Sequence, residues 1–359
     1  MNILMNEDLA FEIDFHPVGD GEKGGDAITI QYGRLNSIYN FSQKVIVIDG
    51  GTLVSGEKIV EHIKNVYNTN TVDLIINTHP DNDHCSGLRE VVNNLTVKEI
   101  WMHRPWLSSR EYLNMFKDGR ITTNSLKQKL KDALNIVSEI EIIAKNKRII
   151  LKEPFTGLTF DNGIITILGP TENFYKKLLP QFQSTPEPAN KNVLSKAFSA
   201  VKNTIQMIAE TMHIETLDES GETSPENNSS VISLFSYTGQ KILFTGDAGI
   251  PALQQVIDIA NYNNITLNDL QVLQIPHHGS KRNVSPSILN SIKAEGAYIS
   301  CPRKGDPKHP AKKVTNALIR RGMKPFHTKG DILCRRHNTL QRTDYSTAIP
   351  IPFYNQVEE

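Results

Sequence analysis

Cysteine is scarce in this chain of 359 residues, and long apolar runs are missing. Its three cysteines, Cys85, Cys301 and Cys334, are too few and too widely spaced for a disulfide framework, which indicates a reducing compartment. No stretch approaches the roughly 18 apolar residues that a membrane-spanning helix needs. Residues 1–12 contain acidic side chains where a signal peptide has basic ones. These absences predict a cytoplasmic protein that does not enter a membrane.

Two further signatures are absent from the sequence, namely an internal repeat and a glycine-rich phosphate loop. The composition, with 38% hydrophobic and 22% charged residues, is typical of a soluble α/β protein. The length allows one large domain or two ordinary ones, and either can bury a sizeable core.

The formal net charge is zero, but the charge is unevenly distributed. Residues 273–345 contain fifteen lysines and arginines against four acidic residues, so this segment carries +11 and the rest of the chain −11. A basic patch beside an active site would suit a polyanionic substrate such as nucleic acid. The alternative is that these side chains form ordinary solvated helix faces.

Two imidazoles and two carboxylates fall within six residues, at His79, Asp81, Asp83 and His84. They follow the apolar residues 72–76, which predict a buried strand. Imidazole and carboxylate together suit Zn²⁺, Mn²⁺ or Fe²⁺, and a loop at a strand end can aim several ligands at one point. A lone histidine or aspartate is usually a satisfied polar residue or a helix cap, but this combination predicts a metal site.

Two more predicted strand ends offer ligands of the same kind. Asp247 follows a predicted strand at residues 241–245, and His277 and His278 follow another at residues 272–276. Three separate ligand loops at strand ends are hard to obtain by accident. The sequence therefore indicates one metal centre assembled from distant segments.

With these motifs the chain resembles the metallo-β-lactamase-fold hydrolases, and among them the soluble domain of ComEC-type competence proteins, which are DNA-uptake channels. That domain has H-P-D-x-D-H where most of the superfamily has H-x-H-x-D-H, and residues 79–84 match the former. The likeness runs nearly end to end. The other matching motifs are V-G and G-G-D-A at residues 18–19 and 24–27, I-D-G-G at 48–51, N-x-x-S-V at 227–231, G-D at 246–247, H-H-G-S-K at 277–281, and H-P with a spaced V and L at 309–318.

The resemblance implies an α/β (α+β) fold, a four-layer αββα sandwich with the metal loops along one edge. It also implies two divalent metal ions, Mn²⁺ or Zn²⁺ with Mg²⁺ as an alternative, and hydrolysis by a hydroxide that both ions share. The ligands that it implies are His79 and Asp81 for one ion, Asp83, His84 and His277 for the other, and Asp247 as the bridge.

The remaining motif residues are expected around the reacting group. The residues expected to take part in catalysis are Asp83, Asp247, His278 and His309, and either histidine could protonate the leaving oxygen or hold the scissile group. The residues expected to bind substrate are Asn227, Ser230, Ser280, Lys281 and Arg282, the last three by contacting a phosphate. The alternatives stay open, because Ser280 also fits a turn and Lys281 also fits a solvated surface.

The chain departs from the wider superfamily at the first metal. Asp81 stands where a histidine is usual, and no histidine occupies the position of the third ligand, for which His213 is the nearest candidate. A site with fewer imidazoles and more oxygens is harder, which favours Mn²⁺ or Mg²⁺ over Zn²⁺. Asp49, in the I-D-G-G motif, either hydrogen-bonds a ligand or closes a turn.

Hydrophobic patterns predict short strands alternating with helices over a single domain, residues 1–359. The predicted strands are 11–15, 27–32, 45–49, 72–78, 99–102, 164–168, 231–236, 241–245, 272–276, 297–301 and 332–335. The predicted helices are 57–67, 85–92, 251–261 and 311–321. Two segments exceed a minimal sandwich and are interpreted as insertions: the mainly helical 105–147, and 171–228 with predicted helices at 172–179 and 192–213.

The leading functional hypothesis is a metal-dependent phosphodiesterase, most simply a nuclease that cuts DNA. An alternative is a hydrolase of small esters, lactones, thioesters or nucleotides, because this fold hosts all of these activities. A third hypothesis is an effector subunit in nucleic-acid defence, silent until a protein partner docks on the insertions. The oligomeric state is not indicated by the sequence.

Overall fold

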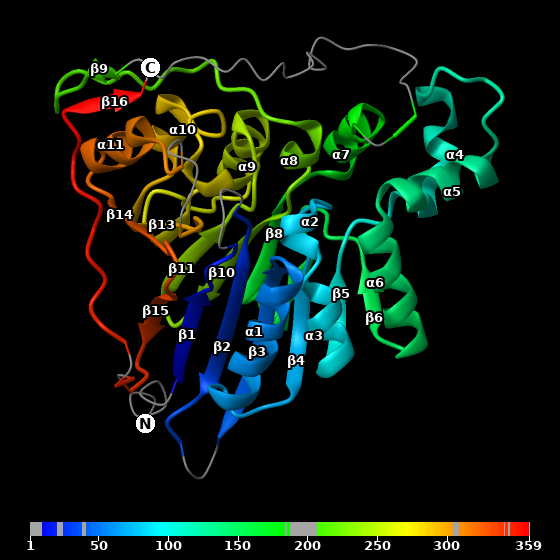
Figure 1. Ribbon diagram of the computed structural model, residues 1–359, viewed down its shortest axis with the longest axis horizontal. Helices are drawn as coiled ribbons and strands as arrows, with labels where there is room; N and C mark the ends of the chain where they lie inside the picture. The colour runs from blue at the N-terminus through cyan, green and yellow to red at the C-terminus, as the bar shows by residue number, and fades with distance from the viewer. Residues whose placement is uncertain are drawn as a thin grey trace.

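The computed structural model describes residues 9–19, 24–37, 41–183, 185–186, 207–303, 309–340, 342–343 and 345–358. Within these residues two seven-stranded sheets stack face to face (Figure 1). The first sheet has the order β15 (Leu333–His337), β1 (Leu9–Phe15), β2 (Ala27–Arg34), β3 (Ser42–Gly50), β4 (Thr71–Ile76), β5 (Thr96–Trp101) and β6 (Ile150–Lys152). The second has the order β14 (Lys324–His327), β13 (Ala294–Ile299), β12 (Leu270–Gln274), β11 (Gln240–Phe244), β10 (Ile232–Tyr237), β8 (Ile165–Gly169) and β7 (Thr159–Phe160).

Strand β1 shows how alternation in the sequence creates the layers. Phe11 and Ile13 lie on the face that packs against the second sheet, and both are fully buried there. Phe11 meets Phe235 of β10 edge to face, with ring centroids 5.4 Å apart. Because successive side chains of a strand point to opposite faces, the polar Glu12 and Asp14 lie on the outer face of the first sheet.

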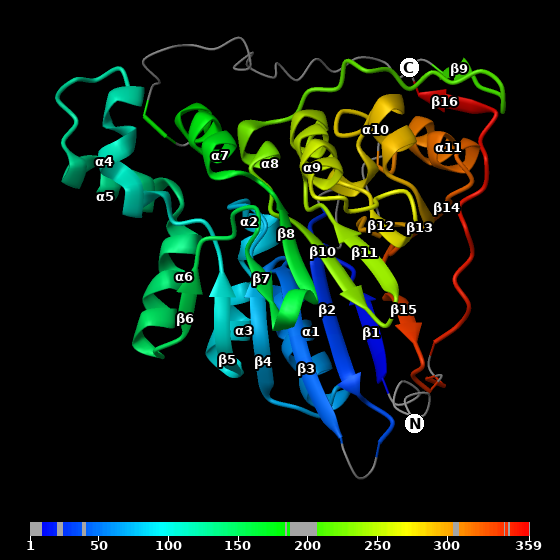
Figure 2. The ribbon, with the colours of Figure 1, turned by 180° about the vertical axis from the view of Figure 1, so that it is seen from behind.

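Helices cover the outer face of each sheet and complete four layers. The first sheet buries a second apolar cluster against α1 (Leu53–Asn65), α3 (Leu88–Asn94) and α6 (Asn135–Asn146). The second sheet buries a third cluster against α9 (Ile250–Tyr262), α10 (Pro286–Ser291) and α11 (Lys312–Arg320). Figure 1 shows α1 and α3 over the strands of the first sheet, and Figure 2 shows the second sheet from the other side. The predicted αββα sandwich is therefore confirmed.

Local sequence signals explain where these helices begin and end. Thr52 precedes α1 and its hydroxyl accepts a hydrogen bond from the N–H of Ser55, which satisfies one of the free donors of the first turn. Ile59 and Ile63, four residues apart, form the buried face of α1. Gly322 follows α11 with φ +79°, a left-handed conformation that glycine adopts without strain.

The shorter helices lie around the site and in the segments interpreted as insertions. They are α2 (Asn82–Cys85), α4 (Ser109–Tyr112), α5 (Thr123–Ala133), α7 (Glu172–Leu178) and α8 (Pro225–Asn228). Residues 105–147 are mainly helical, as expected, and Figure 1 shows α4 and α5 extending away from the two sheets. That these segments are insertions in a single domain stays a prediction.

Two of the helix predictions were wrong in part. Residues 85–92 form the end of α2 and most of α3, with a break at Gly87, where a Cβ would lie 2.0 Å from the carbonyl oxygen of Gly50. The helix predicted over 192–213 lies largely outside the described residues. Its last part is not helical, because β9 (Met207–Ala209) pairs with β16 (Gln356–Glu358) near the end of the chain.

The sheets bring the motif loops to one edge. Strands β3, β4 and β5 run parallel, as do β11, β12 and β13, so within each set the carboxyl ends meet at one edge. The loops that follow β4, β11 and β12 carry the predicted ligands, and such an edge is where α/β proteins commonly bind ligands.

Within the part of the chain that the structure describes, no helix is long and apolar enough to cross a membrane.

Candidate metal centre

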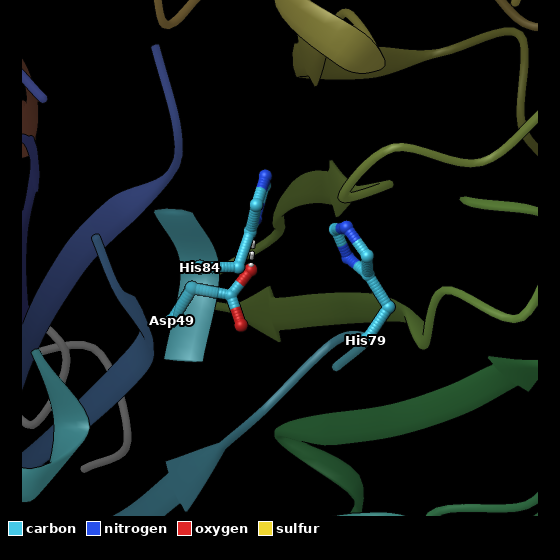
Figure 3. Close-up of side chains that lie close together, drawn as sticks. All are labelled: Asp49, His79 and His84. Carbon is cyan, nitrogen blue, oxygen red and sulfur yellow. Dashed lines mark hydrogen bonds and ion pairs between the residues drawn. The ribbon is translucent and has the colours of Figure 1, made fainter. Parts of the chain in front are cut away.

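Asp49, at the end of β3, joins two of the motif loops. Its carboxylate is fully buried and accepts hydrogen bonds from the N–H of Thr78 at 2.7 Å and from Nδ1 of His84 at 2.9 Å (Figure 3). Since a carboxylate at this position accepts, Nδ1 of His84 carries a proton, and Nε2 is the ring nitrogen that is left to face a metal. Of the two roles predicted for Asp49, the geometry matches the one in which it hydrogen-bonds a ligand.

Three imidazole nitrogens surround one oxygen of Asp247. Oδ2 of Asp247 lies 3.8 Å from Nε2 of His79, 3.5 Å from Nε2 of His84 and 3.7 Å from Nε2 of His277. Two ligands that share a tetrahedral metal with bonds of about 2.1 Å lie roughly 3.4 Å apart. These separations are close to that spacing, and they bring together ligands from three loops that are distant in the sequence.

Two of these imidazole nitrogens and the other carboxylate oxygen of Asp247 lack hydrogen-bond partners within the described part of the chain. Nε2 of His79, Nε2 of His84 and Oδ1 of Asp247 are buried and make no hydrogen bond there. A buried polar atom without a partner costs about 1–3 kcal/mol, so proteins rarely leave several together. A divalent cation would satisfy all three, and the residues present therefore fit a metal.

The electrostatics of the centre lead to the same conclusion. Burial alone would lower the pKa of His84, but the carboxylates of Asp247 and Asp49 raise it well above its usual value. Burial likewise opposes ionisation of Asp247, yet His277 and His84 hold its pKa well below the usual range. The carboxylates thus create a strong demand for positive charge, which bound cations would meet.

Asp81 lies at the outer rim of the centre. Its side chain is 43% exposed, and Oδ2 is 3.7 Å from Nε2 of His79. Burial raises the pKa of Asp81, but the neighbouring His79 outweighs this effect and lowers it overall. The structure thus brings Asp81 close to His79, and that these two residues hold one metal stays a prediction.

Asp83 and His84 come together with His278 in a second candidate group. One ligand atom of each lies within 4.8 Å of the others. Nδ1 of His278 donates to the carbonyl oxygen of Ser300 at 2.9 Å, which leaves Nε2 as an acceptor. The family resemblance implied that His277 belongs to this group, whereas the structure has His278 beside Asp83 and His84.

His277 instead faces Asp247 and is held by amide side chains. Its Nδ1 lies 3.1 Å from Nδ2 of Asn227 and 3.0 Å from Oδ1 of Asn283. Ser230, fully buried, accepts a hydrogen bond from the N–H of Asp247 at 3.1 Å. Asn227 and Ser230, predicted to bind substrate, therefore lie behind two of the candidate ligands and contact protein groups.

The remaining predicted residues lie around the rim. Ser280 is buried and its hydroxyl accepts from the N–H of Arg282 at 3.2 Å, so its turn role is realised. The ring of His309 lies 5.9 Å from that of His277 and 6.5 Å from that of His278, centroid to centroid. Lys281 and Arg282 line a neighbouring pocket.

His213, the candidate for a third ligand of the first metal, is exposed. It lies within the bridge that Thr211 forms with Ile214, whose carbonyl oxygens accept from Arg320 of α11. The candidate ligand groups found among the described residues do not include it.

Asp26 is the residue that the motif analysis missed. It is buried, accepts from Nε2 of Gln274 at 2.7 Å, and lies 3.8 Å from Nδ1 of His84. Burial raises its pKa, and the nearby His84 opposes this. With His84 and Asp247 it forms another candidate ligand group. The G-G-D-A motif was the available signal, but sequence spacing alone did not bring residue 26 to residue 84.

Part of the chain matches a known protein family. Residues 38–141 match the model of the metallo-beta-lactamase superfamily. ComE operon protein 3 of Bacillus subtilis (strain 168) is 27% identical over 124 residues, which are 34% of this chain and 15% of that protein. The chain thus spans only a small part of this curated relative.

Among solved structures the chain is similar to a diphosphatase from the PhnP family, with 11% identity, a TM-score of 0.40 and coverage of 91% of this chain and 98% of that one. It is also similar to the long form of RNase Z from yeast, with 11% identity, a TM-score of 0.39 and coverage of 92% and 42%. The family match, the curated relative and the two-sheet architecture confirm the resemblance drawn from the motifs. Residues 38–141 thus match the metallo-β-lactamase superfamily, and the described residues form the two-sheet sandwich of that fold.

Proposed function

We propose that this chain is a metal-dependent phosphodiesterase that cleaves nucleic acid, with DNA as its substrate. The observation that supports metal-dependent hydrolysis is that three imidazole nitrogens lie 3.5–3.8 Å from Oδ2 of Asp247. Nε2 of His79 and Nε2 of His84 are buried without a hydrogen-bond partner among the described residues, and a bound cation would explain both.

Two divalent cations would be held by the candidate ligands around Asp247. His79 and Asp81 would hold the first, and Asp83 and His84 with a histidine of the 277–278 pair would hold the second. When bound, such ions supply Lewis-acid stabilisation of a phosphoryl group and a nucleophile at neutral pH. Asp247, whose Oδ2 lies 3.8 Å from Nε2 of His79 and 3.5 Å from Nε2 of His84, would serve as a further ligand.

The protein's own contribution is orientation and proton transfer. Asp49 fixes the ring of His84, and the hydroxyl of Thr78 lies 2.9 Å from Nδ1 of His79. Both contacts aim Nε2 of these rings at Asp247. His309, at the rim, is the candidate to protonate the leaving oxygen.

The proposal of a nucleic-acid substrate rests on the ComEC-like motifs and on the basic segment. The structure shows that some basic side chains of this segment form ion pairs within the protein. Arg320 pairs with Glu210 at 2.9 Å and Arg321 with Glu215 at 2.8 Å. These arginines therefore hold the fold together, and only part of the +11 charge remains to attract a polyanion. Lys281 and Arg282 directly follow the H-H-G-S motif and are the basic residues nearest to the candidate ligands in the sequence.

The test is to incubate metal-reconstituted protein with labelled single- and double-stranded DNA, a chromogenic phosphodiester and a lactone. We expect both DNA and the phosphodiester to be hydrolysed and the lactone to survive. Asp247→Ala and the isosteric Asp247→Asn should abolish hydrolysis while the circular dichroism spectrum stays native. Turnover of the lactone alone would favour the small-ester alternative, and full activity in both Asp247 variants would refute the proposed centre.

A further inference from the structure

A second concave site is formed by two loops and the start of α11. It has a volume of about 320 Å³, at the lower end of the range of small-ligand pockets. The lining residues that matter here are Asp218, Gly221, Glu222, Lys281, Arg282 and Lys313. All of them belong to described segments of the chain.

One wall of this pocket continues directly from the metal centre, because Lys281 and Arg282 follow the H-H-G-S motif. The other wall, residues 216–222, packs tightly against it. A Cβ on Gly221 would lie only 2.6 Å from the carbonyl oxygen of Arg282, so a side chain at that position would push the walls apart. The pocket is therefore a built feature and not an accidental gap between loops.

The second wall is also tied to the centre. It leads into Thr223, whose hydroxyl accepts from Nδ2 of Asn227 at 2.8 Å. That same amide nitrogen lies 3.1 Å from the ring of His277. The pocket is thus connected to the metal centre through Asn227 at one wall and through the H-H-G-S motif at the other.

The charge of the pocket favours an anion. Lys313 is only 7% exposed, which is rare for lysine, and burial together with the nearby Lys313 lowers the pKa of Lys281. Three of the five charged residues that line the pocket are basic and two are acidic. Asp218 accepts from the N–H of Ser220 at 2.8 Å and from its hydroxyl at 2.6 Å, and Glu358 and Asp218 only partly offset the effects of burial and of Lys313 on the pKa of Lys281. An anion between the ammonium groups would relieve their repulsion.

We propose that this pocket binds the phosphate of a polynucleotide next to the scissile one, with Lys313 as its buried anchor and Lys281 and Arg282 at its mouth. The inference rests on the proposed phosphodiesterase function. It adds Lys313, which no sequence motif indicated, as a residue that determines specificity for a substrate with more than one phosphate.

The test compares a thymidine dinucleotide carrying terminal phosphates at both ends with its unphosphorylated form, by calorimetric titration of the metal-free full chain. The wild-type protein should prefer the phosphorylated form by about tenfold, the effect of a charge-assisted hydrogen bond. Lys313→Gln should remove the preference. The matched control is Lys312→Gln, which deletes the same charge one residue away, where the ammonium lies over the ring of Tyr354 at 5.1 Å.

An equal affinity for both dinucleotides in the wild type, or equal effects of the two substitutions, would overturn the proposal. The proposal would also be overturned if inorganic phosphate bound as tightly as the phosphorylated dinucleotide and lost this affinity in Lys313→Gln. The pocket would then be a site for a free anion. The titration measures binding without hydrolysis, so its outcome does not depend on catalytic activity. Failure to cleave any phosphodiester would refute the proposed function, but the binding preference could still be tested.

Discussion

Asp81 is the residue that gives this centre its particular ligand chemistry. In the wider superfamily a histidine stands at its position, and here a carboxylate that is 43% exposed lies 3.7 Å from Nε2 of His79. An oxygen ligand is harder than an imidazole, and ligand hardness is one of the few levers by which proteins select among divalent metals.

We therefore expect Mn²⁺ to support faster turnover than Zn²⁺, and Asp81→His to move the preference toward Zn²⁺. The measurement is the phosphodiesterase rate of metal-stripped protein reconstituted with each ion, together with the bound metal per chain by elemental analysis. Because Asp81 lies at the rim, the variant should fold normally. The idea fails if the parent works equally well with both ions and the substitution leaves their ratio unchanged.

The residues of the centre differ in how far sequence could identify them. His79, Asp81, Asp83 and His84 share one loop, so their proximity follows from spacing alone. The choice between His277 and His278 depends on two consecutive positive φ angles, +48° and +58°, which turn the two rings toward different partners. No local pattern in the sequence encodes that turn.

At the scale of elements, the centre depends on the close approach of a glycine-rich strand end to α2. A Cβ on Gly25 would lie 1.8 Å from the carbonyl oxygen of Asp83, so only glycine allows residues 24–27 to pass here. This approach also brings Asp26 to His84. The G-G-D-A motif is thus explained by packing against the ligand loop.

Gly25→Ala should displace the loop of Asp83 and weaken metal binding by at least about tenfold, as loss of ligand support generally does. Gly119→Ala is the matched control, since nothing lies within 4 Å of a Cβ at that position. Metal affinity would be measured by competition with a chelating dye and the fold by thermal unfolding. Unchanged affinity in Gly25→Ala would show that the ligand loop tolerates the shift.

Elements with a strong local pattern were predictable, and those formed by distant pairing were not. Alternating or continuous apolar residues identified the central strands of both sheets to within a few residues, because each buries its side chains whatever its partner. Strand β9 was missed since Met207–Ala209 becomes a strand only through β16, at Gln356–Glu358. The split between α2 and α3 was missed for a similar reason, because it depends on the backbone of Gly50.

At the scale of the whole molecule, the free energy of unfolding should fall at low pH partly because of a residue outside the metal centre. His16 lies on the outer face of the first sheet, and burial, followed by the nearby His62, lowers its pKa to about 3. The unfolded chain binds a proton there below about pH 6.5, and the folded chain does not. Stability from this residue is therefore full above pH 6.5 and is lost progressively as the pH falls toward 3.

Between pH 7 and pH 5 the loss from His16 should be about 2 kcal/mol. His16→Gln keeps a donor for the hydroxyl of Thr29, which lies 2.9 Å from Nε2 of His16, but cannot titrate. Its free energy of unfolding, measured by urea denaturation, should depend on pH less than that of the wild type by this amount. The exposed His213→Gln is the control. Parallel curves for all three proteins would contradict the argument.

The charge distribution of the whole chain gives the last prediction. The basic segment, residues 273–345, forms ion pairs with the acidic remainder of the chain, such as Arg342 with Glu12 at 2.7 Å. Such paired charges contribute little to attracting a polyanion, so DNA binding should depend on a few side chains near the centre and not on the whole basic segment.

DNA affinity should fall as salt rises, with a slope of roughly −0.9 per phosphate contact on a duplex and about −0.7 on a single strand. Replacing Lys281 and Arg282 by alanine should reduce the slope by about one to two units and slow DNA cleavage much more than cleavage of a small uncharged ester. Replacing Arg335 and Arg336, which stand near the other end of the basic segment in the sequence, should leave the slope nearly unchanged. An affinity independent of salt, or equal losses on both substrate types, would instead indicate a small-ester hydrolase whose basic residues serve the fold.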